Sequence, residues 1–407
     1  MRSLPYLLLA ALAIAACASA APEDDYQLDY RVAIGLDGVA DVTLSVSQTD
    51  GQLKRLRLNN HDNTLTDFEG SLERIDSKQY LWQVPRSGGT VTWRAQVPTT
   101  PQSSGIKAAI MPTWGLFRIE TMLPGLASVT RPGAESRTTL TIEPPASWQV
   151  LTPYPSDGQD SHFIVDDRDR RFDRPDGWIL IGDIGVRRDT IAATKVAVAA
   201  PKGLEARRLD VMAFANWHLP RVRRLFADFP DRLLIVMADD PFFRGGLSAP
   251  NSLFLHVDRP MISGNGTSTF LHELFHVGLS RSAADGDDWI VEGLAEYYSL
   301  VWLYRTGTVT ERRHLGTLSQ LREWAASADT LRTSRASGAT TALAVGVFDE
   351  LDKEISKRTA NEKSLDDVVR LLGEREDTLD LSALREAAML VCGEIPDALK
   401  DEHLPGY

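Results

Sequence analysis

The feature that most constrains this chain is a pair of histidines enclosing a glutamate, His272-Glu273-Leu274-Phe275-His276. On an α-helix, residues four positions apart lie one above the other on the same face, so the two imidazoles point the same way. Two neutral imidazoles on one face are suited to hold a divalent zinc ion. Glu273 is placed to take a proton from a water molecule on that metal. The segment therefore predicts a zinc-binding helix.

The sequence around this motif favours a helix. Breakers at residues 264–266 precede three candidates for the helix N-cap, which are Thr267, Ser268 and Thr269. An apolar side that the helix can bury is supplied by Leu271, Leu274, Phe275 and Leu279.

A catalytic zinc needs a third protein ligand and one open position. After the polar loop 281–288, residues 289–298 predict a second helix, and Glu292 on it is our third ligand. Glu296 lies one turn further along the same face, where it is placed to accept the outer N–H of a ligand histidine. The alternative is two amphipathic helices with surface glutamates and ordinary histidines. We favour the metal site because the motif and its surroundings agree.

The combination of H-E-x-x-H with a following W-x-x-E-G-x-x-x-Y resembles the gluzincin metallopeptidases, which include thermolysin and the aminopeptidase N family. The glycyl aminopeptidase family is the nearest match. Residues 244–252 resemble its glycine-rich strand G-G-L-E-H-x-x-S, residues 343–352 its Y-x-K-G helix, and residues 364–370 a later S-L-D-D segment. The resemblance extends from about residue 239 to residue 372.

This resemblance implies a zinc-dependent metallopeptidase, a hydrolase acting on a peptide or protein substrate. One catalytic Zn²⁺ is expected on His272, His276 and Glu292. Water in the fourth position is expected to lose a proton to Glu273 and to attack the scissile carbonyl, and Glu273 then passes the proton to the leaving amine.

The glycine-rich segment implies a substrate-binding role for Gly245, Gly246 and Ser248. In relatives, a glutamate at the position of Ser248 reads the free amino terminus of the substrate, and the next residue here is Ala249 instead of histidine. An aminopeptidase needs an anion for that ammonium group. Three alternatives remain open, which are internal cleavage, another mode of substrate recognition, and loss of activity.

The oxyanion-binding tyrosine of Y-x-K-G aligns with Leu343, and no tyrosine occurs between Tyr304 and Tyr407. Losing one such donor costs roughly 3–4 kcal/mol of transition-state stabilisation. The replacements that we consider are Arg332, Arg335 and His314. Two rival functions follow, a zinc-bearing pseudo-peptidase that binds peptides or envelope proteins, and a zinc hydrolase that is not a peptidase. The retained Glu273 argues against the first.

Residues 1–21 predict an export signal, with Arg2 ahead of an apolar run at 4–16. Residues 14–17 resemble a bacterial lipobox that would lipidate Cys17 and tether the protein to a membrane. Residues 18–20 also fit an ordinary A-x-A cleavage that would discard Cys17. Either route predicts an exported protein, in the bacterial periplasm, anchored as a lipoprotein or secreted.

We predict an α+β multidomain fold. Residues 22–190 predict a β-sandwich-like domain, 191–310 a thermolysin-like α/β zinc catalytic domain, and 311–407 a helical domain. Residues 206–229 predict one helix or two segments broken at Pro220. Residues 252–257 predict the sheet edge above the zinc helix, where an extended peptide could add as a strand, and His256 within it is expected to be structural. The formal net charge of −12 excludes nucleic acid as a partner, because that needs a basic face.

Overall fold

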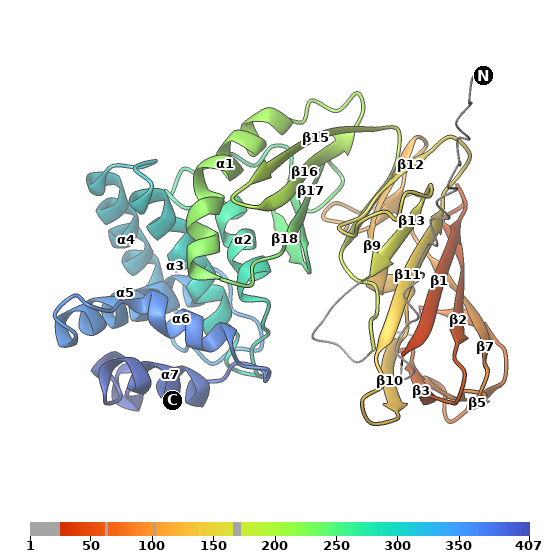
Figure 1. Ribbon diagram of the computed structural model, residues 1–407. Helices are drawn as coiled ribbons and strands as arrows, with labels where there is room; N and C mark the ends of the chain where they lie inside the picture. The colour runs from red at the N-terminus through yellow and green to blue at the C-terminus, as the bar shows by residue number, and fades with distance from the viewer. Residues whose placement is uncertain (1–24, 62–63, 101–102, 166–171) are drawn as a thin grey trace, which may run out of the picture.

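The computed structural model describes residues 25–407 except 62–63, 101–102 and 166–171 (Figure 1). The predicted export signal and Cys17 lie outside the described residues. Within this part of the chain, no helix has both the length and the apolar character that a membrane span requires.

The N-terminal part of the chain is built from three sheets of mostly alternating strands. The first contains, in spatial order, β13 (His162–Val165), β11 (Ser136–Glu143), β1 (Tyr26–Ile34), β2 (Val39–Ser47), β7 (Gly88–Gln96) and β4 (Thr66–Glu69). The second contains β10 (Gly125–Thr130), β3 (Leu53–Asn59), β6 (Gln79–Gln83) and β5 (Leu72–Arg74). The third contains β12 (Gln149–Leu151), β14 (Trp178–Gly182), β9 (Trp114–Arg118) and β8 (Ala109–Ile110), with a 3-10 turn at Ile119–Met122.

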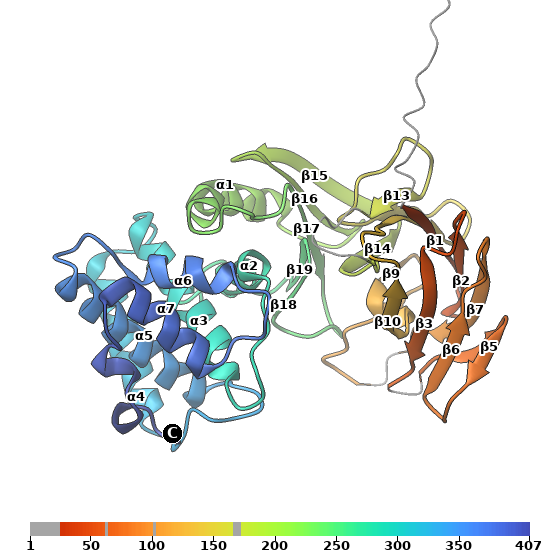
Figure 2. The ribbon, with the colours of Figure 1, turned by 60° about the horizontal axis from the view of Figure 1, so that its bottom comes forward.

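Alternation in sequence explains the first of these strands. Every second residue of β1 is buried, and β2 runs antiparallel to it. Gly38 in the connecting turn has φ of 75°, and a Cβ there would lie 2.1 Å from the carbonyl oxygen of Val97. Trp82 and Trp93, from the second and first sheets, are both buried in one shared core. The two sheets therefore share this core, and they form the β-sandwich on the right of Figure 2.

A separate five-stranded sheet follows in the chain. Its spatial order is β15 (Ile184–Ile191), β16 (Thr194–Pro201), β17 (Arg232–Ala238), β19 (Ser252–His256) and β18 (Gly246–Ala249). Strands β16, β17 and β19 are parallel, and β15 and β18 are antiparallel to their neighbours. The domain boundary at residue 190 remains a prediction, and the pairing of β15 places residues 184–191 in this sheet.

One sequence expectation for this part is wrong, and one open alternative is resolved. Strand β19 is internal, because the hairpin through Asn251 folds β18 back onto it, so β18 and not residues 252–257 forms the sheet edge. Helix α1 (Arg208–Leu225) runs unbroken through Pro220. Burial of Leu219 and Val222 on either side of the proline outweighs its cost of about 3 kcal/mol.

Helices make up the C-terminal part of the described chain, at the opposite end of the molecule from the sandwich (Figures 1 and 2). They are α2 (Thr269–Leu279), α3 (Asp288–Arg305), α4 (Glu311–Ala325), α5 (Ala339–Arg358), α6 (Leu365–Gly373) and α7 (Leu381–Cys392), followed by 3-10 turns at Asp397–Leu399 and Asp401–His403. Gly293 lets α3 approach α5 closely, since a Cβ there would lie 2.5 Å from the Cβ of Ala344.

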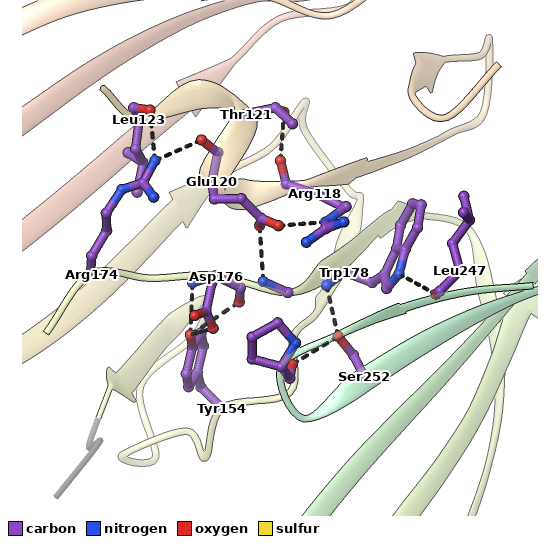
Figure 3. Close-up of polar contacts among 12 residues, drawn as sticks. Arg118, Glu120, Thr121, Leu123, Tyr154, Arg174, Asp176, Trp178, Leu247 and Ser252 are labelled. Carbon is purple, nitrogen blue, oxygen red and sulfur yellow. Dashed lines mark hydrogen bonds and ion pairs between the residues drawn. The ribbon is translucent and has the colours of Figure 1, made fainter. Parts of the chain in front are cut away.

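The third N-terminal sheet, which contains β14, is hydrogen-bonded to the five-stranded sheet through Trp178 (Figure 3). Its indole N–H donates to the carbonyl oxygen of Leu247 at 3.0 Å, and its backbone N–H donates to Ser252 Oγ at 2.9 Å. Leu247 belongs to β18 and Ser252 to β19. Glu120 strengthens the junction on the sandwich side by accepting the N–H of Gly177 at 3.0 Å. The sandwich therefore holds the hairpin that carries the sheet edge.

Candidate metal centre

Helix α2 forms as the sequence predicts. Ser268 caps its N-terminus by accepting the N–H of Leu271 at 3.3 Å. Leu274 and Phe275 are fully buried in the core beneath the helix. Ser280 ends the helix in a left-handed conformation, with its N–H on the carbonyl oxygen of His276 at 2.9 Å.

The three predicted ligands converge on one point between α2 and α3. The Nε2 atoms of His272 and His276 are 3.1 Å apart, and they lie 3.2 and 3.5 Å from the two carboxylate oxygens of Glu292. Bonds of about 2.0–2.1 Å from zinc to tetrahedral ligands would set those ligands about 3.3–3.4 Å apart. Among the described residues, this is the trio of histidine, cysteine or acidic side chains placed to share an ion.

Glu296 determines which ring nitrogen of His272 faces the other ligands. The Nδ1 of His272 lies 3.1 Å from Glu296 Oε2, so this nitrogen carries the proton and donates it. Nε2 of His272 is then the ring nitrogen left to bind a metal. Two ring nitrogens and a carboxylate directed at one point are stabilised by a cation, and this donor set fits zinc.

The three ligands differ in protonation before a metal binds. Burial alone would lower the pKa of His272, but its hydrogen bonds to Glu292 and Glu296 outweigh burial and raise the pKa well above its ordinary value, so a metal must displace the Nε2 proton. Burial, with the neighbouring charge of His272, lowers the pKa of His276 to about 4, so this imidazole is neutral at ordinary pH. Burial alone would raise the pKa of Glu292, but its contacts with His272 and His276 outweigh burial and lower the pKa. Glu292 is therefore ionised.

Glu273 lies beside the trio and is 8% exposed. Burial raises its pKa, and the charge of Glu292 adds to the effect. The hydroxyl and the backbone N–H of Ser248 donate hydrogen bonds to the Glu273 carboxylate. These hydrogen bonds lower the pKa of Glu273 and so oppose the effect of burial. A carboxylate that is buried, oriented and raised in pKa is suited to accept a proton near neutral pH.

Strand β18 brings the predicted substrate-binding residues against α2. A Cβ on Gly246 would lie 2.5 Å from Cγ of Glu273, so the strand can approach the helix only with glycine at this position. The N–H of His256 donates to the carbonyl oxygen of Gly245 at 3.0 Å. Backbone groups alternate in direction along an antiparallel strand, so those of Gly246 and Ser248 point away from β19, on the side where the N–H of Ser248 donates to Glu273.

A hollow of about 290 Å³ opens beside the ligands. One wall carries His272, Glu292 and Glu296. The facing wall includes side chains and backbone from α4, from the 326–338 loop and from the start of α5, among them Leu321, Trp324, Arg335, Ser337, Gly338 and Thr341. A larger hollow of about 1080 Å³ lies elsewhere, between α4 and α5, and contains none of the ligands.

The position opposite the ligands differs from the sequence expectation. Leu343 lines the larger hollow, so its assignment to that position is wrong. Gly338 and Thr341 face the ligands instead. The breaker Gly338, directly before α5, is the sequence signal that could have identified this position.

The structure separates the three replacements considered for the missing tyrosine. Arg335 lines the hollow beside the ligands. Arg332 lies over the ring of Tyr407, 5.2 Å from its centroid. His314 stacks on Tyr304 with the ring centroids 4.7 Å apart. Only Arg335 of these three reaches the site.

His256 is buried at 1% exposure, and its Nδ1 accepts the N–H of Asp258 at 3.2 Å. Its Nε2 lies 3.6 Å from Asp240. It is not part of the ligand trio, which agrees with the structural role expected for it.

The fold resembles solved zinc metallopeptidases. An aminopeptidase N family protein from Idiomarina loihiensis matches with a TM-score of 0.64 at 17% identity, over 85% of this chain and 70% of that chain. A variant of the M1 zinc metallopeptidase from Deinococcus radiodurans bound to a Tyr-Ser-Ala substrate matches with a TM-score of 0.61 at 13% identity, over 92% and 91%. Leukotriene A4 hydrolase from Saccharomyces cerevisiae matches with a TM-score of 0.58 at 16% identity, over 94% and 68%.

Comparison with protein-family models gives no match, and comparison with curated proteins gives none either. Identities below a fifth establish likeness of fold alone. At that level the expected likeness in fold to zinc metallopeptidases of the aminopeptidase N type is confirmed, and this chain has an α+β multidomain fold similar to theirs.

Proposed function

We propose that this chain is a zinc-dependent metallopeptidase that hydrolyses peptide bonds with Glu273 as general base. The observation that carries the proposal is the convergence of His272, His276 and Glu292 within 4.8 Å of one another, with the buried carboxylate of Glu273 beside them. A fold shared with zinc metallopeptidases supports it.

When bound, zinc polarises the scissile carbonyl and lowers the pKa of a water molecule in its open position. Glu273 accepts a proton from the attacking water and passes it to the leaving amine. Ser248 keeps the carboxylate of Glu273 oriented through its hydroxyl and its N–H. Glu296 holds Nδ1 of His272, which leaves Nε2 as the nitrogen that would bind the metal.

The substrate that best suits the site is an extended peptide lying along β18. The backbone groups of Gly246 and the carbonyl oxygen of Ser248 are directed to the free edge of the sheet, where they can pair with a peptide whatever its side chains. Within the described structure, β18 itself carries no carboxylate to bind a free amino terminus. Cleavage within a chain, without a requirement for a free amino terminus, is therefore the proposed mode.

A second candidate is a zinc-bearing pseudo-peptidase that binds a peptide or envelope protein without cutting it. The observation in its favour is that Gly338 and Thr341, with no phenol, face the ligands from the start of α5. The buried and hydrogen-bonded Glu273 argues against it, because binding alone needs no general base.

The test is digestion of a diverse peptide mixture by the zinc-loaded mature protein, read by mass spectrometry beside Glu273→Gln. We expect internal cuts from the wild type and none from the variant, with equal zinc content in both. Stepwise loss of amino-terminal residues would overturn the proposed mode. Absence of cleavage with zinc bound would favour the pseudo-peptidase.

We also propose that the protein is exported and that Cys17 is its lipidated first residue. The support is the apolar run and the lipobox-like segment that precede the β domain. Mass spectrometry of the mature amino terminus decides between the two processing routes. An acylated Cys17 would support lipidation, and a chain that begins after Ala20 would refute it.

A further inference from the structure

Among the described residues that line the hollow beside the ligands, none carries a phenol that could stabilise the charge developing on the substrate carbonyl. A side chain that takes this role must face the ligands from the opposite wall and must be a hydrogen-bond donor. Among the described residues lining the hollow beside His272 and Glu292, Arg335 is the only cationic side chain outside the ligand helices. This wall therefore offers one charged donor.

The loop that carries Arg335 is fastened to the helix that carries Glu292. The backbone N–H of Ala336 donates to the carboxylate of Asp288 at 2.7 Å, and Asp288 begins α3. A backbone bridge joins Thr333 to Asp287 immediately before that helix. Arg335 thus lies between two anchored positions, over the turn of α3 that leads to Glu292.

The guanidinium of Arg335 is available to a ligand. Within the part of the chain that the structure describes, no carboxylate lies within the 4 Å of an ion pair with Arg335, and the side chain is exposed. Arg335 nevertheless lines the same hollow as His272 and Glu292. Gly338 adds no side chain between the loop and the hollow.

We propose that Arg335 is a catalytic residue whose guanidinium donates hydrogen bonds to the scissile carbonyl oxygen as that oxygen becomes negatively charged. The inference rests on the proposed peptidase function. Water adds to the carbonyl carbon, the C–O double bond becomes a single bond, and the electron pair moves to the oxygen that Arg335 faces. The pair returns when the C–N bond breaks, and the guanidinium of Arg335 keeps its proton throughout because arginine is not deprotonated in proteins.

The test compares Arg335→Ala with wild type and with Arg332→Ala. Arg332 is the matched control because it lies on the same loop and stacks on Tyr407 away from the ligands. We expect Arg335→Ala to lower kcat by about 100-fold to 1000-fold with KM and zinc content little changed, as for loss of one oxyanion donor. Arg332→Ala is expected to keep kcat. Added guanidinium ion at millimolar concentration is expected to restore part of the rate of Arg335→Ala and to leave Arg332→Ala unchanged.

Binding provides a readout that does not depend on turnover. A phosphinic peptide carries a tetrahedral anionic group in place of the scissile amide, so Arg335→Ala is expected to bind it about 100-fold more weakly than wild type does. The corresponding amide peptide should bind equally to Glu273→Gln with and without Arg335→Ala. Isothermal titration calorimetry measures both.

Three results would overturn the inference. Arg335→Ala could retain wild-type kcat and phosphinate affinity. It could raise KM alone, or lose its effect when the carboxyl terminus of the substrate is amidated, which would make Arg335 a reader of that terminal carboxylate. If the wild type cleaves no peptide, the proposed function fails, while unequal phosphinate affinities would still place Arg335 at the tetrahedral group.

Discussion

Replacing Gly246 by alanine isolates the close approach of β18 to the catalytic helix. Gly246 does not have a positive φ, so the substitution introduces no backbone strain. Its new Cβ would lie 2.5 Å from Cγ of Glu273 and 2.7 Å from Cγ2 of Thr269. Carbon atoms in favourable contact stand about 3.5–4.0 Å apart, so the strand, the helix or Glu273 must move by roughly 1 Å.

Two effects of different size follow from this displacement. Overpacking of a well-packed contact costs about 1–3 kcal/mol of stability. A catalytic group misplaced by about 1 Å loses on the order of 100-fold in rate. Because Glu273 is the residue nearest to the new Cβ, we expect the loss of kcat to be larger than the loss of stability. Gly246→Ala should therefore stay folded and bind zinc, yet cleave peptides about 100-fold more slowly.

The matched control is Gly346→Ala in α5, where a Cβ would meet nothing within 4 Å. Alanine in place of glycine inside a helix gains up to about 1 kcal/mol, so this variant should unfold at a slightly higher temperature with unchanged kcat. Thermal unfolding by circular dichroism and peptide cleavage are measured for both variants. A Gly246→Ala protein with wild-type kcat would refute the reasoning that the glycine positions Glu273.

Three further predictions concern other contacts. Glu296→Ala removes the acceptor for Nδ1 of His272, so zinc should bind about 10–100-fold more weakly in competition with a chelator, and equal affinity would count against the tautomer argument. Burial lowers the pKa of His218, so as the pH falls through about 6.5 the unfolded chain binds a proton at His218 before the folded chain does. The contribution of His218 to stability is therefore fully present above that pH and decreases below it. The difference in unfolding free energy between pH 7.5 and pH 5.5 should be smaller in His218→Gln than in wild type. Trp178→Phe removes the hydrogen bond to Leu247 and should cost about 1 kcal/mol or more in denaturant unfolding, whereas an unchanged midpoint would mean that the junction does not depend on this bond.

The metal centre was predictable because its geometry is mostly local. The spacing of His272 and His276 fixes their common face whatever surrounds the helix. Glu292 and Glu296 follow the same rule on the next helix, and the loop between the helices is short. The structure brings these four side chains together, and their roles as metal ligands and as support for a ligand remain a proposal.

The walls of the site were harder to predict, because they depend on contacts between distant segments. Alternation in residues 252–257 predicts a strand but does not reveal that β18 covers its outer side. The face that α5 turns to the ligands depends on its packing against α3, where Gly293 meets Ala344. The weak match to the Y-x-K-G motif therefore aligned Leu343 with the oxyanion-binding tyrosine. Nothing in the sequence favoured Arg335 over Arg332 or His314 as its replacement.

The measurement that tests the central claim most directly is anomalous X-ray diffraction at the zinc edge, from crystals of the protein prepared with zinc. The account predicts one strong peak about 2.0–2.2 Å from Nε2 of His272, Nε2 of His276 and a carboxylate oxygen of Glu292. Zinc bound through other residues, or no peak between α2 and α3 despite zinc in the crystal, would contradict it.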